Sequence, residues 1–368
     1  MKILFLSNSI GGLKSFRMEL IEYLLKRGDI VGICSPIEIK PDFFKDMGCR
    51  IFPLDMSRHG KNPFTELKMI KDIKSVLKSF NPDVVSAYTI KPNIYGSIAC
   101  HKLNIPIINS VTGLGSAVEN GGLMQKISVL LLKMGMKYAD HVYFQNKESQ
   151  DFFKTHNIKL KSQSLIAGSG VNLARFELTP YPSITNPIKF LYTGRILEAK
   201  GVGLFLEAAK QLSMKYKNVE FHIVGIKDDV KYSNLVDEYA EKGIIIFHGY
   251  QKDPRKFIAM SHCQIHPTYY PEGMSNVLLE SAAMGRPAIT TDRSGCREIV
   301  DNNITGYIIS QRDQNALISA MERFINLPYE EKMQMGINAH NKVAKNFDRD
   351  SVVKEYISKI ESLVLSKN

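Results

Sequence analysis

The chain has 368 residues, 44% hydrophobic and 23% charged, a length and composition that predict a folded protein of two domains. Its five cysteines show no C-x-x-C spacing, so neither a disulfide framework nor a zinc site is indicated, and a reducing compartment is expected. The net charge of +11 comes from lysines spread along the chain without a basic tract, which disfavours nucleic acid as a partner.

Short apolar runs alternate with helical patterns in the first half of the chain. The N-terminal run is too short for a signal peptide and predicts a buried strand. Six strands are predicted, at Lys2–Ser7, Asp29–Ser35, Arg50–Leu54, Asp83–Ala87, Pro106–Val111 and His141–Gln145. Helical patterns lie between them, for example at Phe16–Arg27 and Pro63–Phe80. Continuous apolar strands separated by helices predict a parallel sheet covered on both faces.

Three segments that follow these strands are candidates for binding a polar substrate. Gly11 and Gly12 allow a close backbone approach to a ligand, or they form a plain tight turn. Lys91 lies in a loop after the fourth strand, where it would meet an acceptor phosphate or face water. Thr112 and Gly113 follow the fifth strand and fit either a substrate loop or an ordinary strand-to-helix turn.

The segment Leu123–Tyr138 predicts an amphipathic helix. One face carries the lysines, at positions 126, 133 and 137, and another carries apolar residues, namely Ile127, Leu130, Leu131 and Met134. The pattern fits contact with a membrane surface, and it also fits a helix packed on the core with its lysines in water. No run approaches the roughly 20 apolar residues of a membrane span.

The stretch Asn172–Pro187 contains three prolines and is the predicted linker. Beyond it the alternation resumes, with strands at Lys189–Thr193, Val219–Gly225, Ile244–Gly249, Gln264–Thr268, Pro287–Thr291 and Gly306–Ile309. The helices include Gly203–Tyr216, Tyr232–Lys242, Asn276–Met284 and Ala316–Asn326. Two Rossmann-like domains are therefore expected, with ligands at the carboxyl ends of the strands.

The segment from Glu272 to Glu280 is the most informative part of the chain. Glu272 lies in a Pro-Glu-Gly turn, and Glu280 lies in the apolar helix that follows. The intervening residues have backbone N–H groups without helical partners, and they are Gly273, Met274, Ser275 and Asn276. Two carboxylates beside an anion-binding helix end suit a ligand with both hydroxyls and phosphate, such as a sugar nucleotide.

Arg195 and Lys200 flank the turn after the first strand of the second half. One cation–phosphate contact at 4 Å is worth about 4 kcal/mol at a dielectric near 20, before desolvation. The pair would stabilise a leaving diphosphate without a metal, or it is a solvated Arg and Lys on a surface loop. Their presence in the same half as Glu272 favours function, whereas His266 is expected to pack near the pocket wall.

Together these segments resemble family 4 of the glycosyltransferases, the retaining group with the GT-B fold. The likeness is most specific in Glu272–Glu280, in its continuation through Pro287, and in Thr291–Glu298. It implies two Rossmann-like domains facing across a cleft, at residues 1–172 for the acceptor and 173–347 for the nucleotide-sugar donor. It also implies a last segment, 348–368, whose helix crosses back to the first domain.

The resemblance assigns roles residue by residue. Glu272 would contact the donor hexose and Glu280 the ribose, while the amides of residues 273–276 would orient hexose and diphosphate. Arg195 and Lys200 would hold the leaving nucleoside diphosphate. The base would be bound at Gly249-Tyr250, and no divalent metal or other cofactor is expected.

One position departs from the family pattern. Many members have a His at the cleft end of the fifth strand, where this chain has Thr112, which puts a His contact in doubt. The Thr112–Ser116 loop and the helix start at Phe16-Arg17-Met18 look more like bacterial enzymes that extend undecaprenyl-diphosphate-linked sugars. The implied enzyme is a hexosyltransferase that moves a hexose, expected to be an N-acetylhexosamine, from a UDP-sugar to a lipid-linked saccharide during cell-surface polysaccharide assembly.

The implied location is the cytoplasm, peripherally on the inner face of the cell membrane. One alternative is a UDP-sugar 2-epimerase of the same fold, against which the Glu272–Glu280 segment argues. Another is a non-catalytic protein that binds a sugar nucleotide or lipid. A NAD-dependent oxidoreductase is disfavoured, because no G-x-G-x-x-G with an acidic partner is present.

Overall fold

The structure is a computed structural model that describes residues 1–56, 63–115, 118, 121–183 and 187–367. The chain divides into two compact units. Unit 1 comprises Met1–Ser169 and Asp350–Asn368, and unit 2 comprises Gly170–Arg349. The divisions predicted after residues 172 and 347 lie within a few residues of these boundaries, and the chain's last segment groups with unit 1.

Unit 1 is built on a seven-stranded parallel sheet with the order β3-β2-β1-β4-β5-β6-β7. The strands are β1 (Lys2–Ser7), β2 (Ile30–Ser35), β3 (Arg50–Pro53), β4 (Val84–Tyr88), β5 (Ile107–Val111), β6 (His141–Phe144) and β7 (Gln163–Leu165). The order reverses between β1 and β4, whose register pairs Leu4 with Val85. Such a switch point is where ligands bind in an open α/β sheet, outside the carboxyl ends of the strands.

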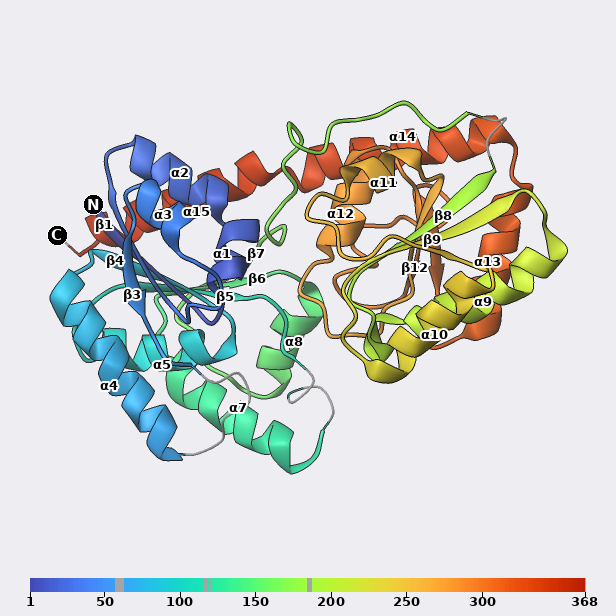
Figure 1. The fold of residues 1–368 in the computed structure, drawn as a ribbon. Coiled ribbons are helices and arrows are strands. Elements are labelled where there is room, and N and C mark those ends of the chain that lie inside the picture. The colour runs from blue at the N-terminus through green and yellow to red at the C-terminus, as the bar shows by residue number, and fades with distance from the viewer. Residues whose placement is uncertain (57–62, 116–117, 119–120, 184–186, 368) are drawn as a thin grey trace. The chain divides into compact units, whose positions relative to one another are not determined.

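Helices cover both faces of this sheet (Figure 1). One layer consists of α4 (Pro63–Phe80), α5 (Ile90–His101) and α7 (Gly122–Met136), and α8 (Lys147–Thr155) follows β6. The other layer consists of α1 (Ile10–Phe16), α2 (Met18–Lys26), α3 (Asp42–Asp46) and α15 (Arg349–Leu365). The final helix packs on the first strands, because Tyr356 and Ile360 share one buried cluster with Ile3 and Phe5.

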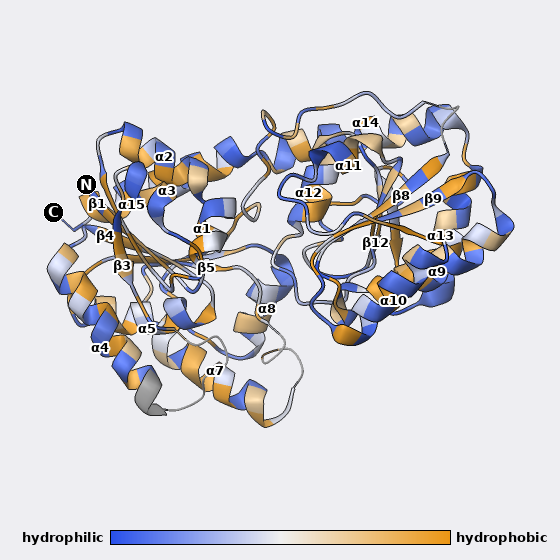
Figure 2. Ribbon diagram, in the orientation of Figure 1, coloured by the Kyte–Doolittle hydropathy of each residue, from blue (hydrophilic) through white to orange (hydrophobic). Residues whose placement is uncertain are grey.

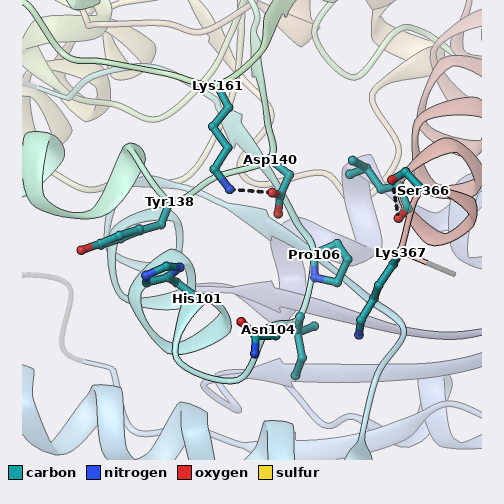
Figure 3. A pocket seen from close by; sticks show the side chains of 10 residues that line it. His101, Asn104, Pro106, Tyr138, Asp140, Lys161, Ser366 and Lys367 are labelled. Carbon is teal, nitrogen blue, oxygen red and sulfur yellow. Dashed lines mark hydrogen bonds and ion pairs between the residues drawn. The ribbon is translucent and has the colours of Figure 1, made fainter.

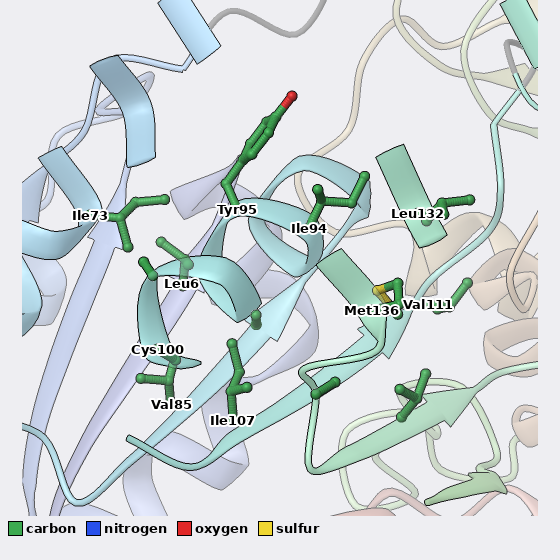
Figure 4. Close-up of a cluster of buried hydrophobic side chains, with 14 of the residues drawn as sticks. Leu6, Ile73, Val85, Ile94, Tyr95, Cys100, Ile107, Val111, Leu132 and Met136 are labelled. Carbon is green, nitrogen blue, oxygen red and sulfur yellow. The ribbon is translucent and has the colours of Figure 1, made fainter. Parts of the chain in front are cut away.

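The apolar strand residues explain why this sheet is buried on both faces. β4, β5 and β6 are buried along their whole length. On the α5 side, Leu6, Val85 and Ile107 meet side chains of α4, α5 and α7 (Figure 4). Figure 2 shows the same pattern, with hydrophobic strands inside and helices coloured differently on their two faces.

Unit 2 repeats the plan with a six-stranded parallel sheet of order β10-β9-β8-β11-β12-β13. Its strands are β8 (Ile188–Thr193), β9 (Val219–Val224), β10 (Ile246–Phe247), β11 (Cys263–His266), β12 (Ala288–Thr291) and β13 (Gly306–Ile309). The order reverses between β8 and β11, which pair with Ile265 opposite Tyr192. The switch point of unit 2 therefore lies between the ends of these two strands.

The helices of unit 2 also form two layers (Figure 1). One holds α9 (Val202–Lys215), α10 (Val230–Glu241) and α13 (Gln314–Asn326), and the other holds α11 (Arg255–Met260), α12 (Asn276–Ala283) and α14 (Tyr329–Asn346). A short 3-10 helix, η1 (Glu198–Lys200), precedes α9. In neither unit is any described helix both long and apolar enough to cross a membrane.

The α/β class and the two parallel sheets are confirmed, and the differences are local. The predicted helix Phe16–Arg27 is wrong at its start, because α1 begins at Ile10 and ends before a break at Arg17. The Arg17 guanidinium lies over the rings of Tyr88 and Tyr356, which holds the break in place. The short edge strand β7 was not predicted.

Candidate functional site

The predicted cations of unit 2 and one of the two predicted carboxylates, Glu272, meet at the switch point between β8 and β11. Arg195 follows β8, and Lys200 ends η1, just before α9 begins. Glu272 lies in the segment between β11 and α12. Because β8 and β11 are parallel neighbours, their carboxyl ends bring these two segments to the same edge of the sheet.

Lys200 and Glu272 form an ion pair, in which the Lys200 ammonium donates to Oε1 of Glu272. Both side chains are only 15% exposed, so water screens the pair less than it screens a surface pair. His266 Nε2 lies 4.0 Å from the same carboxylate oxygen. The structure thus joins two residues that the sequence had only placed in one domain.

Tyr270 brings the two predicted cations together. The Lys200 ammonium lies 4.7 Å from the centre of its ring, and the Arg195 guanidinium lies 5.6 Å from it. Arg195 also forms an ion pair with Asp228 at 3.0 Å, and both of these side chains are exposed. Tyr270 was missed in the sequence, although it lies two residues before Glu272.

The main chain around the two cations is fixed by a buried tyrosine. The Tyr192 hydroxyl donates to the carbonyl oxygens of Arg195 at 3.0 Å and Lys200 at 3.3 Å. Burial raises the pKa of this phenol, so Tyr192 stays neutral and keeps its proton for donation. Gly201 has a φ of +74°, and a Cβ there would lie 2.1 Å from the Pro267 carbonyl oxygen. The two loops are therefore packed directly on each other.

The turn that carries Glu272 packs closely against Gly295. A Cβ at Gly295 would lie 2.7 Å from the Gly273 carbonyl oxygen and 3.0 Å from Cβ of Glu272. The Gly295 N–H donates to Glu298 at 2.7 Å, which closes its own turn. Gly295 and Glu298 lie in the Thr291–Glu298 segment that the sequence singled out, and the structure shows what they support.

The expectation that the backbone N–H groups before α12 are open needs correction at Ser275. Its N–H donates to the Gly295 carbonyl oxygen at 2.8 Å. Its hydroxyl caps α12 by accepting from the Leu278 N–H at 3.5 Å, and it also lies 3.1 Å from His266 Nε2. Ser275 therefore holds the turn in shape. Gly273 and Met274 are buried in the same turn, and Asn276 begins α12.

Glu280 lies within α12, partly buried beside other charged groups of unit 2. Burial raises the pKa of its carboxyl from the usual 4.5 to about 7, although Arg349 and Arg175 act in the opposite direction. Asp253 adds to the increase by like-charge repulsion. Near neutral pH this carboxyl is therefore divided between its neutral and ionised forms. None of these neighbours is close to Glu280 in sequence.

Gly249 and Tyr250 lie at the same edge of the sheet, after β10. The Gly249 carbonyl accepts from the Gly225 N–H at 3.0 Å. A Cβ at Gly225 would lie 1.8 Å from the carbonyl oxygen of Gly194, so the turns after β8 and β9 are in contact. Tyr250 is 69% exposed, and its ring is open to a stacking partner. The base contact that the family resemblance implies at Gly249-Tyr250 stays a prediction.

The glycine candidates of unit 1 do not form a loop. Gly11 and Gly12 lie in the first turn of α1, where the Ser9 hydroxyl accepts from the Gly12 N–H at 3.0 Å. The segment is therefore a capped helix start and not a tight turn, and contact of these glycines with a ligand stays a prediction. Thr112 and Gly113 follow β5 as expected, and Gly113 has a φ of +118°.

Lys91 is also helical, because α5 already begins at Ile90. Its ammonium forms an ion pair with Glu66 at 2.7 Å, and the two side chains are 22% and 16% exposed. Lys91 is therefore not a lysine in open water, and its contact with a phosphate stays a prediction. An acceptor phosphate would have to compete with Glu66 for Lys91.

Two pockets lie within single units and away from the Lys200–Glu272 pair. One, of about 290 Å³, is at the amino edge of the unit 1 sheet (Figure 3). His101, Tyr138, Asp140 and Lys161 are among its lining residues. The other, of about 420 Å³, is lined in unit 2 by Arg175, Asp253, Arg255 and neighbouring residues. Arg175 and Asp253 are also two of the charges that act on Glu280.

No described group of three or more His, Cys, Asp or Glu residues has the geometry to hold a metal ion. His266 is buried, and burial lowers the pKa of its imidazole to about 3, so it is neutral. Its Nδ1 has no hydrogen-bond partner within the described part of the chain. The predicted position at the wall of the site, 4.0 Å from Glu272, matches this structure.

Comparison with protein families identifies the chain. A model described as glycosyl transferase 4-like matches residues 2–146, and one described as glycosyl transferases group 1 matches residues 176–342. The two matches lie in unit 1 and unit 2 and account for most of the chain. This chain is a family 4 glycosyltransferase. The resemblance seen in the sequence and the assignment as an enzyme are confirmed.

Two relatives of this glycosyltransferase act on lipid-linked sugars, as their names state. It is 26% identical, over 99% of both chains, to the N,N'-diacetylbacillosaminyl-diphospho-undecaprenol alpha-1,3-N-acetylgalactosaminyltransferase of Campylobacter jejuni. It is 24% identical, over 95% of this chain and 92% of the other, to the UDP-Gal:alpha-D-GlcNAc-diphosphoundecaprenol alpha-1,3-galactosyltransferase of Escherichia coli.

The GT-B fold is confirmed by solved structures. HepE of Anabaena in complex with UDP matches with a TM-score of 0.80 at 16% identity, over 98% of this glycosyltransferase and 100% of that chain. At this identity the match concerns the fold alone. The roles of individual residues follow from the geometry and remain predictions.

Proposed function

We propose that this glycosyltransferase moves a hexose, an N-acetylhexosamine, from a UDP-sugar to a saccharide linked to a polyprenyl diphosphate, with retention of the anomeric configuration. The observation that carries the proposal is the convergence of Arg195, Lys200 and Glu272 around Tyr270 at the switch point of unit 2. The names of the Campylobacter and Escherichia relatives support the substrate classes.

The donor's charged centre is assigned to the two cations. The diphosphate would lie against Arg195 and Lys200, which are already held near each other by the Tyr270 ring. In the absence of donor, Asp228 and Glu272 satisfy their charges. When the diphosphate takes over Lys200, the Glu272 carboxylate is released to accept hydrogen bonds from hydroxyls of the hexose. One exchange of partners would thus prepare both groups.

The nucleoside is assigned to the neighbouring turns. Glu280 would accept hydrogen bonds from the ribose hydroxyls, and the exposed ring of Tyr250 beside Gly249 would stack on the base. The amides of the turn before α12 would orient the hexose and diphosphate, except for the Ser275 N–H, which Gly295 occupies. These roles place the scissile bond near Glu272 and the base near β10.

The proposed reaction is a front-face substitution. The bond between the anomeric carbon and the diphosphate oxygen breaks, and UDP leaves with the electron pair. The acceptor hydroxyl attacks the anomeric carbon from the same face, and its proton passes to the departing phosphate oxygen. Arg195 and Lys200 stabilise the negative charge that grows on UDP, and preorganised charges of this kind commonly contribute factors of about 10² to 10³. We propose that no divalent metal is needed for this step.

The acceptor is assigned to the carboxyl edge of the unit 1 sheet. Thr112 and Gly113 follow β5 there, and Gly11, Gly12 and Lys91 lie in the first turns of α1 and α5. The Lys91–Glu66 pair would have to open for Lys91 to meet an acceptor phosphate. Because a lipid diphosphate acceptor resides in a membrane, we further propose that the enzyme works in the cytoplasm, peripherally on the inner face of the cell membrane.

A screen of UDP-sugars for UDP release, with and without a short-chain polyprenyl-diphosphate saccharide, tests this function. The expected result is release from one UDP-N-acetylhexosamine that depends on the acceptor and is matched by glycolipid formation. Interconversion of UDP-hexosamines without acceptor would show the epimerase, which the relatives do not favour. UDP binding without turnover on any acceptor would show a non-catalytic protein.

A further inference from the structure

One face of α7 in unit 1 exposes large apolar side chains to solvent. Leu123, Ile127, Leu130 and Met134 are exposed by 72%, 43%, 59% and 50%. Their spacing of i, i+4, i+7 and i+11 places them in one stripe along the helix. Single exposed apolar residues are normal on a protein surface, whereas a continuous stripe marks a site of interaction.

The opposite side of α7 already has its packing partners. Val129, Leu132 and Met136 are buried, and Leu132 and Met136 point into the core that α7 shares with α5 and the sheet (Figure 4). Gly135 lets the two helices approach closely, since a Cβ there would lie 2.7 Å from the Ile94 carbonyl oxygen. Packing on the protein core therefore accounts for this side of α7 only. It leaves the exposed apolar stripe on the other side without a role.

A row of lysines runs beside the stripe. Lys126, Lys133 and Lys137 are exposed, and α7 contains no Asp or Glu between Gly122 and Met136. Within the described residues none of the three forms an ion pair with a carboxylate, and Lys137 lies 4.9 Å from the Tyr138 ring. Apolar side chains flanked by unneutralised lysines match the headgroup region of an anionic bilayer.

We propose that this surface, here named the α7 face, binds the enzyme to an anionic membrane. The apolar stripe would enter the boundary between headgroups and acyl chains, and the three lysines would meet lipid phosphates. This proposal rests on the proposed function, because an enzyme with a lipid-linked acceptor has to meet that acceptor at the membrane. It adds the surface that makes the contact and the charge of the membrane that is bound.

The position of α7 in the chain connects the membrane with the acceptor loop. Thr112 and Gly113 follow β5, and α7 begins at Gly122, nine residues after Gly113 in the sequence. Gly121 and Gly122 both have positive φ, a backbone conformation that glycine adopts without strain, so the helix starts with a sharp turn. A bilayer against α7 would thus bring a membrane-anchored diphosphate close to the loop assigned to it.

Vesicle flotation tests the α7 face directly. The wild-type protein should float with vesicles of phosphatidylcholine and phosphatidylglycerol, and at least about tenfold less with phosphatidylcholine alone. Ile127→Glu/Leu130→Glu should reduce flotation at least about tenfold, since it puts two charges into the apolar stripe. The control, Leu67→Glu/Met214→Glu, changes two apolar residues outside α7 that are 64% and 67% exposed, and it should float like wild type.

Activity measurements separate this proposal from the proposed function. The Ile127→Glu/Leu130→Glu variant should keep wild-type turnover on a short-chain, water-soluble acceptor and lose most turnover on a long-chain acceptor embedded in vesicles. Equal flotation of this variant and wild type would overturn the α7 face, even if transfer is observed. So would self-association through α7, seen as a dimer in sedimentation that the variant abolishes, with no vesicle binding. Absence of turnover on every soluble acceptor would instead count against the proposed function.

Discussion

Lys200 donates to the Glu272 carboxylate in the interior of the candidate site, with each side chain only 15% exposed. The two residues come from turns after different strands, β8 and β11, and three helices and three strands, from α9 to β11, lie between them in the sequence. Their contact turns two separate motifs into one site. It also means that each residue is the other's counter-charge until a ligand replaces it.

Removing either member of this pair should strongly reduce transfer. Lys200→Ala removes a charge from the leaving diphosphate, and Glu272→Ala removes the hexose contact, so kcat/KM should fall by about 10² to 10³ in each. Because each variant removes the counter-charge of a side chain that is only 15% exposed, the free energy of unfolding should fall by about 1 to 3 kcal/mol. Steady-state transfer and thermal unfolding measure the two effects. Lys210→Ala, an exposed lysine on α9, is the control and should change neither.

The ring of Tyr270 should matter more than its hydroxyl. The ring lies beside both Arg195 and Lys200, and such contacts contribute about 0.5 to 2 kcal/mol each. Tyr270→Phe keeps the ring and should retain most of kcat/KM, whereas Tyr270→Ala should lose about tenfold or more. Kinetics of both variants with the same UDP-sugar make the comparison. Equal loss in both would assign the effect to the hydroxyl and contradict the cation–π arrangement.

UDP binding should depend on pH through Glu280. Burial raises the pKa of its carboxyl to about 7, so the ionised form that accepts ribose hydrogen bonds is scarce at pH 6 and dominant at pH 8. The affinity for UDP should therefore increase with pH over this range, and Glu280→Gln should bind more weakly with a smaller dependence. Calorimetric titrations of both proteins at several pH values provide the test. A parallel pH dependence in the variant would exclude Glu280 as its source.

The same shift has a consequence for stability. The folded-state pKa of Glu280 is raised above its usual 4.5, so the folded state holds this proton more tightly than the unfolded chain. The contribution of Glu280 to the free energy of unfolding should fall as the pH rises from about 4.5 to about 7. Denaturant unfolding of wild type and Glu280→Gln at several pH values across this window measures the effect. The difference in free energy of unfolding between the two proteins should change with pH in the direction given.

Gly295 should be intolerant of a side chain although it contacts no substrate in our assignment. Gly295 has a φ of +85°. A Cβ added there would lie 2.7 Å from the Gly273 carbonyl oxygen and 3.0 Å from Cβ of Glu272. Gly295→Ala should therefore displace the Glu272 turn and reduce both stability and kcat/KM. Gly243→Ala is a matched control, because its φ of +67° imposes similar strain but no atom lies within 4 Å. Unfolding and transfer measurements should separate the clash from the strain.

The strands of both sheets were predictable because strands buried on both faces are continuous apolar runs. β4 and β5 are completely buried, and their sequences show it. β7 was missed because a three-residue edge strand, Gln163–Leu165, carries too little pattern. The helical start at Ile10 was missed because two glycines suggest a turn, and here the Ser9 cap stabilises the helix instead.

The sequence motifs predicted which residues belong to the candidate site, but not which of these residues contact each other. Glu272, Arg195 and Lys200 were placed in one domain from the sequence, but no spacing rule reveals that Lys200 pairs with Glu272. The pairing of Lys91 with Glu66 and the effect of Arg349 on Glu280 are likewise contacts between distant parts of the chain. Such contacts depend on how the elements pack, so they require the three-dimensional structure.

The most direct test of the central claim is proton NMR of the reaction with a UDP-N-acetylhexosamine and a short-chain polyprenyl-diphosphate saccharide. We predict that UDP and an α-linked product appear together in equal amounts, and that neither appears without acceptor. A β-linked product would contradict the retaining mechanism. Conversion of the UDP-sugar without acceptor would contradict the assignment of this site to glycosyl transfer.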